Sequence, residues 1–136
     1  MNKLLLLSRH YPSYAQIELA KVMGFEGIRL EKVVFPDSKA ELEKIIDILP
    51  ECGRIVGLVS PTWVHTVFWE NGFSTIEFVR SHISEEVISN PKFYNIFICR
   101  GAWLFKSNGN SVKGVFTECP LTMEEQLSFA GREISE

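Results

Sequence analysis

The chain of 136 residues lacks the short motifs by which common cofactor and catalytic sites are recognised. It has no GxGxxG or Walker loop, no HExxH, no GxSxG and no cluster of Asp and Glu suited to magnesium. Its three cysteines are widely spaced and form no CxxC pair, which argues against zinc or a disulfide framework and fits a reducing cytosol. We therefore expect no cofactor, no metal and a cytoplasmic location.

The chain also lacks an excess of positive charge and a long apolar run. The net charge is -3 and the pI is about 5.7, so the chain lacks the overall positive charge with which proteins bind long nucleic acids. A small anionic ligand in a local positive pocket remains compatible with this charge. Ser8 and Arg9 interrupt the apolar run Leu4–Leu7, and no segment approaches the roughly 18 apolar residues of a membrane helix. We expect no membrane partner.

What is present is an alternation of buried strands and amphipathic helices. The composition, 46% hydrophobic and 23% charged, is typical of one globular domain over residues 1–136. Strands are predicted at Leu4–Leu7, Gly27–Phe35, Arg54–Val59 and Thr75–Val79. Helices are predicted from about Tyr14 to Met23, after Ser38 as far as Pro50, from Thr62 to Gly72, and near Ser84. Such alternation predicts an α/β fold with a mostly parallel sheet flanked by helices.

The last third of the chain has a different pattern. Strand-like aromatic stretches, Phe93–Cys99 and Ala102–Lys106, precede the turn signal Ser107–Ser111. Val112–Thr117 then predicts a returning strand, and Thr122 begins a capping box for a terminal helix. Residues 1–89 are therefore expected to form the α/β core, and residues 90–136 a β-hairpin with a terminal helix.

Polar residues follow two of the predicted strands. Ser8, Arg9 and His10 follow the first strand, and Ser60, Pro61 and Thr62 follow the third. In parallel sheets ligands bind beyond the carboxyl ends of strands, at the switch point that the first and third strands usually flank. A guanidinium can fork onto a phosphate, and an imidazole can donate to a phosphate or move a proton. Alternatively, Arg9 is only solvated and His10 caps a carbonyl.

The helix that begins after the third strand offers further candidates. Its free N–H groups and the hydroxyls of Ser60 and Thr62 suit an anion, although both residues are also preferred helix caps. Trp63 can stack on a base or pack against protein. His65 either faces the cleft or is a buried structural histidine, and Arg80, expected just after the fourth strand, would reach the same edge.

These residue types favour RNA-type cleavage without a metal. In that chemistry the 2′-OH of the substrate attacks the adjacent phosphorus, while the protein aligns it and offsets charge on the phosphorane oxygens. Basic and hydroxyl side chains are sufficient for that role.

Two segments of the chain resemble motifs of the small standalone CRISPR-associated ring nucleases, Rossmann-like proteins related to the CARF sensor domains. The segments are Ser8-Arg9-His10-Tyr11-Pro12 and Val56–His65, and the likeness covers roughly the first 90 residues. In that family the first strand ends in a Thr/Ser-Arg-His-Pro type motif, whereas here Tyr11 intervenes before Pro12. A later strand of the family ends in a Gly-Thr-Leu-Pro type turn.

The resemblance implies a Rossmann-like homodimer that opens cyclic oligoadenylate, expected to be cyclic tetra-adenylate, into linear products with 2′,3′-cyclic phosphate ends. Such cleavage switches off type III CRISPR signalling. The resemblance implies that Arg9, His10, Ser60 and Thr62 of each subunit lie near the phosphates of the ring. Together with the residue positions above, this predicts Ser8, Arg9 and His10 as catalytic residues. The predicted ligand-binding residues are Ser60, Pro61, Thr62, Trp63, His65 and Arg80.

Two other functions remain open at this point. The first is a non-catalytic sensor or sponge that only binds the cyclic nucleotide. The second is a protein-interaction module, because the expected hairpin carries many aromatic side chains. These are Phe93, Tyr94, Phe97, Trp103 and Phe105.

Overall fold

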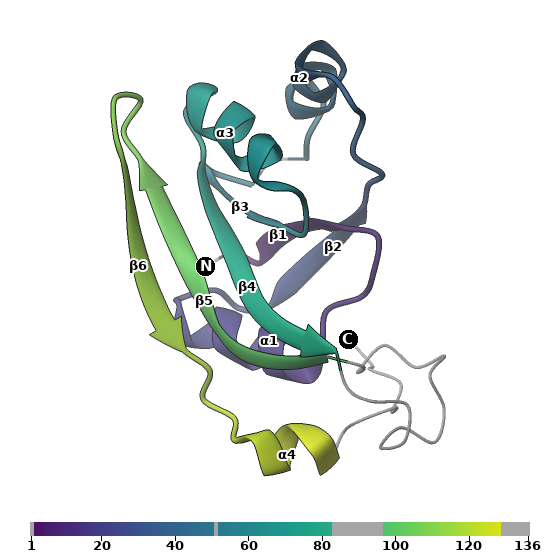
Figure 1. The fold of residues 1–136 in the computed structure, drawn as a ribbon, viewed down its shortest axis with the longest axis vertical. Helices are drawn as coiled ribbons and strands as arrows, with labels where there is room; N and C mark the ends of the chain where they lie inside the picture. Colours follow the sequence, from purple (N-terminus) through teal and green to yellow (C-terminus); the bar gives the residue numbers. More distant parts are fainter. Residues whose placement is uncertain (1, 51, 83–96, 129–136) are drawn as a thin grey trace.

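The computed structural model describes residues 2–50, 52–82 and 97–128. Helices and strands alternate through the first part of the chain and give way to a β-hairpin (Figure 1). The elements in chain order are β1 (Leu4–Ser8), α1 (Tyr14–Val22), β2 (Ile28–Lys32), α2 (Lys39–Asp47), β3 (Ile55–Leu58), α3 (Thr62–Glu70), β4 (Ser74–His82), β5 (Phe97–Ser107), β6 (Val112–Glu118) and α4 (Met123–Ser128).

The strands form one six-stranded sheet in the order β2-β1-β3-β4-β5-β6. The pairs β1–β2, β1–β3 and β3–β4 are parallel, whereas β4–β5 and β5–β6 are antiparallel. The predicted α/β fold, with a mostly parallel Rossmann-like sheet, a C-terminal hairpin and a terminal helix, is therefore confirmed. The chain turns to opposite sides of β1 for β2 and β3, so the switch point lies between β1 and β3.

The buried residues form two layers, one on each face of the sheet. Leu4 and Leu6 pack with α1 on one face, while Leu5 and Leu7 pack with α2 and α3 on the other. Figure 1 shows α1 on the side of the sheet opposite α2 and α3. All five residues of β1 are buried, which explains why this strand is a continuous apolar run rather than an alternating one.

The ends of α1 follow the predicted local chemistry. The Ser13 side chain accepts a hydrogen bond from the Gln16 N–H, and the Gln16 side chain accepts one from the Ser13 N–H, which completes a capping box. Gly24 has a φ of 103° just past the helix, a left-handed conformation that glycine adopts without strain. Val22, at the end of the helix, is 58% exposed, because Ala15, Leu19 and Ala20 occupy the inward positions.

The strands β2, β4 and β5 differ most from the prediction. β2 ends at Lys32 rather than Phe35, and β4 continues to His82 rather than stopping at Val79. β5 runs unbroken from Phe97 to Ser107, although two separate stretches were expected around Arg100. The pairing with β4 skips Arg100, because Val79 is opposite Gly101 and Arg80 is opposite Cys99, and the ladder with β6 begins at Gly101. The polar interruption is therefore an irregularity within one strand and not a break between two. The helix predicted near Ser84 lies outside the described residues.

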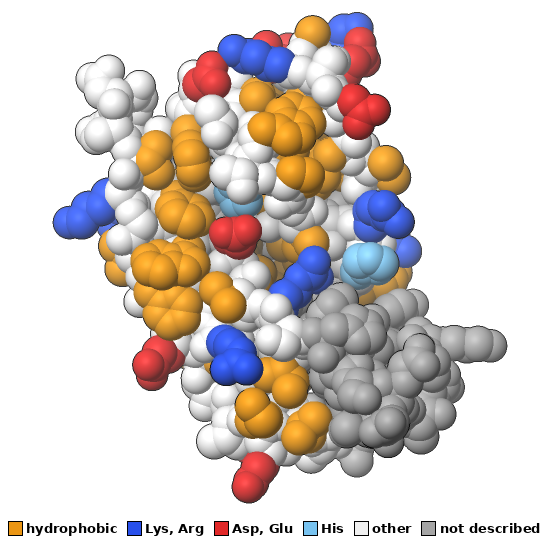
Figure 2. All heavy atoms as spheres, viewed as in Figure 1, with side chains coloured by type: hydrophobic (Ala, Val, Ile, Leu, Met, Phe, Trp, Pro, Cys, Tyr) orange, Lys and Arg blue, Asp and Glu red, His pale blue; other side chains and the backbone are white. Residues whose placement is uncertain are grey.

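The C-terminal extension joins the same sheet and leaves an aromatic surface. Trp103, Phe105 and Phe116, here called the aromatic cluster, pack side by side on β5 and β6. Figure 2 shows hydrophobic side chains gathered over these two strands. α4 is held to the sheet by Gln126, whose side chain accepts a hydrogen bond from the Cys99 N–H (2.7 Å) and donates one to the Cys99 carbonyl (2.8 Å).

In the described part of the chain, every helix is too short or too polar to span a lipid bilayer.

Packing at Gly101 predicts a specific sensitivity of the hairpin. A Cβ at this position would lie 2.5 Å from the Thr117 carbonyl oxygen and against the Phe116 ring. Gly101→Ala should therefore lower the free energy of unfolding by about 1–3 kcal/mol, as measured by chemical denaturation. Gly114→Ala is the matched control, because its Cβ would meet only side chains, at 3.3 Å. Equal stability of the two variants would contradict this prediction.

Candidate functional site

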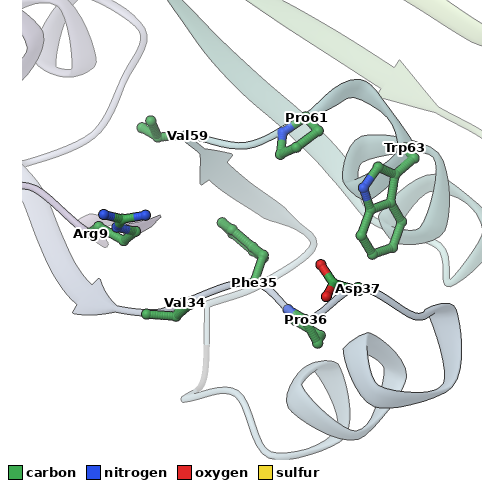
Figure 3. A pocket seen from close by; sticks show the side chains of 8 residues that line it. All are labelled: Arg9, Val34, Phe35, Pro36, Asp37, Val59, Pro61 and Trp63. Carbon is green, nitrogen blue, oxygen red and sulfur yellow. The ribbon is translucent and has the colours of Figure 1, made fainter.

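A pocket of about 240 Å³ opens beyond the carboxyl ends of β1, β2 and β3. Figure 3 shows its lining, which comes from three separate segments of the chain. The lining residues are Arg9, Val34, Phe35, Pro36, Asp37, Val59, Pro61 and Trp63. The pocket therefore lies at the switch point, as the sequence predicts.

Backbone hydrogen bonds to β1 position both walls of this pocket. The Val33 N–H donates to the Ser8 carbonyl at 3.2 Å, and the Val59 N–H donates to the Leu7 carbonyl at 3.1 Å. The segments that follow β2 and β3 are thus tied to the end of β1, from which Arg9 emerges. The pocket is a direct consequence of pairing β1 with a parallel strand on each side.

Of the three residues Ser8, Arg9 and His10, only Arg9 lines the pocket. Arg9 is exposed and lines the pocket, and within the described residues its guanidinium has no hydrogen-bond or ion-pair partner. Ser8 is buried, and its hydroxyl oxygen accepts a hydrogen bond from the His10 N–H at 3.0 Å, which holds the turn. His10 is exposed and is not part of the pocket lining.

The start of α3 differs from a hydroxyl-capped helix. Pro61 occupies the N-cap position and no side chain caps the helix, so of the two alternatives for Ser60 and Thr62 the structure does not show capping. The Ser60 hydroxyl instead donates to the Pro61 carbonyl at 3.3 Å. The first N–H groups of α3 are left without a side-chain acceptor, next to Pro61 and Trp63 in the pocket wall. Ser60 and Thr62 are not part of the lining.

Sequence reasoning missed the segment after β2. Val34, Phe35, Pro36 and Asp37 form half of the lining, and Asp37 is on the other side of the pocket from Arg9 (Figure 3). These residues were missed because the strand was predicted to continue as far as Phe35. The topology could have indicated them, because β2 is parallel to β1 and ends at the same edge of the sheet.

His65 lies in the interior, away from the pocket. Only 2% of its surface is exposed, and its Nδ1 lies 2.8 Å from the Thr75 hydroxyl oxygen, which also accepts a hydrogen bond from Trp69 Nε1 at 2.9 Å. Its Nε2 has no partner among the described residues. Burial lowers the pKa of His65 from 6.5 to about 4. The structure therefore does not bring His65 to the pocket.

Arg80 lies within β4, not in a loop after it, because β4 extends to His82. Its side chain is half-buried, burial lowers its pKa, and it does not line the pocket. Of the nine residues predicted for the site, the structure thus brings together Arg9, Pro61 and Trp63 in the lining. Within the described ranges, no three residues of the types His, Cys, Asp and Glu are grouped closely enough to hold a metal ion.

The buried His65 predicts a stability that falls with acidification. The folded protein resists protonating this imidazole until about pH 4, whereas an unfolded chain takes up the proton near pH 6.5. Stability should therefore decrease from pH 6.5 to pH 4, by up to about 3 kcal/mol from this group. Denaturant unfolding across this range should show a weaker pH dependence for His65→Gln than for the wild type.

The matched control for this pH dependence is His10→Gln, because His10 is exposed. A His65→Gln variant with the same pH dependence as the wild type would show that His65 does not stay neutral in the folded protein.

Comparisons with known proteins do not assign this chain to a family. No family model, curated protein or solved structure matches it significantly. The likeness to ring nucleases therefore rests on the two sequence motifs that begin at Ser8 and Val56.

Proposed function

We propose that the protein is a metal-independent ring nuclease that opens cyclic oligoadenylate, with cyclic tetra-adenylate as the expected ring. The observation that carries this proposal is Arg9, a guanidinium without an ion-pair partner in the described chain, in a pocket at the switch point. An uncompensated cation at this edge of a parallel sheet suits a phosphate group. The sequence likeness at Ser8–Pro12 makes that phosphate part of a cyclic oligonucleotide.

In this proposal Arg9 stabilises negative charge in the transition state and does not itself form or break a bond. The 2′-OH of one nucleotide attacks the adjacent phosphorus and the 5′-oxygen leaves, which gives a 2′,3′-cyclic phosphate. Negative charge accumulates on the phosphorane oxygens, and a guanidinium fixed beside them lowers the barrier. The first N–H groups of α3, which no side chain caps, border the same pocket and supply further donors.

The proposed role of His10, which follows Arg9 in the chain and lies outside the pocket lining, is proton transfer. The hydrogen bond from the His10 N–H to the Ser8 hydroxyl orients the turn that carries both Arg9 and His10. An imidazole at this place can receive the 2′-OH proton or return a proton to the leaving oxygen. Ser8 then acts as a positioning residue, because its own side chain is buried.

The size of the pocket favours action as a homodimer. Its volume of about 240 Å³ is below the roughly 300–1,000 Å³ typical of pockets for drug-sized ligands. One pocket of this volume is too small to enclose a ring of four nucleotides. Two copies of the chain around a twofold axis would present two pockets to one ring.

The test is incubation of purified protein with cyclic tetra-adenylate in EDTA, with products separated by chromatography and identified by mass. We expect linear products that carry 2′,3′-cyclic phosphate. Arg9→Ala should slow cleavage by about 100-fold, the cost typical of removing one group that stabilises transition-state charge. Arg29→Ala is the matched control, since Arg29 is exposed on β2 outside the pocket lining.

An intact ring after long incubation at high enzyme concentration would contradict cleavage. Tight binding without turnover, lost in Arg9→Ala, would instead support the sensor or sponge. Equal rates for the Arg9→Ala and Arg29→Ala variants would remove Arg9 from the mechanism.

The aromatic cluster favours a second candidate function, a protein-interaction surface. Trp103 is 37% exposed and Phe116 is 40% exposed, and aromatic side chains are enriched in protein interfaces. Phe93 and Tyr94, also expected in this surface, lie outside the described residues. This function is compatible with the pocket, because the cluster belongs to β5 and β6 and the pocket to β1, β2 and β3.

A further inference from the structure

The pocket has opposite charges at its two ends. Arg9 projects from the segment after β1, and Asp37 projects from the segment after β2 on the far side of the pocket (Figure 3). Neither side chain has a hydrogen-bond or ion-pair partner within the described residues. The two groups therefore do not neutralise each other, and each remains available to a ligand.

This arrangement orients any ligand that carries a phosphate. The phosphate is attracted to Arg9 and repelled by the Asp37 carboxylate, so the other end of the ligand faces Asp37. A carboxylate only accepts hydrogen bonds, and the matching ligand group is an N–H donor. A ligand end that presents only acceptors to Asp37 would be disfavoured.

The walls near Asp37 suit a flat heterocycle. Trp63 is 36% exposed and lines the pocket together with Phe35 and Pro36. In Figure 3 Asp37 lies between the Phe35 and Trp63 side chains. Aromatic side chains stack on the faces of bases without regard to base identity, so a base stacked on Trp63 would have to be selected by a polar group.

We infer that Asp37 selects the base, accepting a hydrogen bond from the exocyclic amino group of a purine that packs against Trp63 while Arg9 holds its phosphate. This inference rests on the proposed function in taking the ligand to be a nucleotide. It assigns to Asp37 the specificity of the pocket, a role that is separate from the cleavage step.

The experiment is a binding cycle with two mononucleotides, measured by calorimetry or NMR titration. The probes are adenosine 5′-monophosphate and purine riboside 5′-monophosphate, which lacks only the amino group. The wild type should bind the adenine nucleotide about tenfold more tightly, the value of one hydrogen bond to a charged group. Asp37→Ala should bind both nucleotides equally, whereas Arg9→Ala should weaken both alike.

Asp47→Ala is the matched control, because Asp47 is an exposed carboxylate at the end of α2, outside the lining. It should retain the tenfold preference. The same preference in the Asp37→Ala variant as in the wild type, or no preference in the wild type, would overturn the inference. Absence of binding by either nucleotide up to millimolar concentration would also overturn it.

Cleavage of cyclic tetra-adenylate in EDTA, measured alongside, separates this inference from the proposed function. Cleavage of the ring without an Asp37-dependent preference for the adenine nucleotide would support the proposed function and contradict base selection by Asp37. An Asp37-dependent preference with an intact ring supports base selection and contradicts the nuclease.

Discussion

Burial of β1 on both faces is the constraint on which the rest of the structure depends. Within Leu4–Leu7, alternate side chains pack against α1 on one face of the sheet and against α2 and α3 on the other. Leu4 and Leu7 are fully buried. A strand in this position has a neighbour on each side, and here both neighbours are parallel. Parallel neighbours require crossovers, which bring three carboxyl ends to one edge. The pocket is formed by the segments that leave this edge.

The sheet has a parallel half and an antiparallel half, and each carries a different surface feature. The parallel half holds the pocket, and the antiparallel half holds the aromatic cluster and α4. α3 joins the two, because its first turn borders the pocket at Trp63 while His65 and Trp69 contact Thr75 of β4 and Phe105 of β5. A change in how the hairpin packs would therefore act on the helix that borders the pocket.

Features that depend only on residues close together in the chain could be predicted from the sequence. The capping box at Ser13, the glycine end of α1 and the turn before β6 each depend on residues that are neighbours in the chain. The errors arose where a distant partner decides. β5 remains one strand because its pairing with β4 continues on both sides of Arg100, which the ladder skips.

The fold class, the switch-point edge of the sheet and the place of Arg9 and Trp63 at that edge could be predicted from the residues alone, because strand and helix periodicity and the order of elements are properties of the chain. That Asp37 lines the same pocket as Arg9, and that His65 does not, became visible in the folded chain. The physical reason is that strand pairing, which ties Val33 to Ser8 and Val59 to Leu7, brings together segments distant in the sequence. Which side chains then share a pocket follows from that pairing.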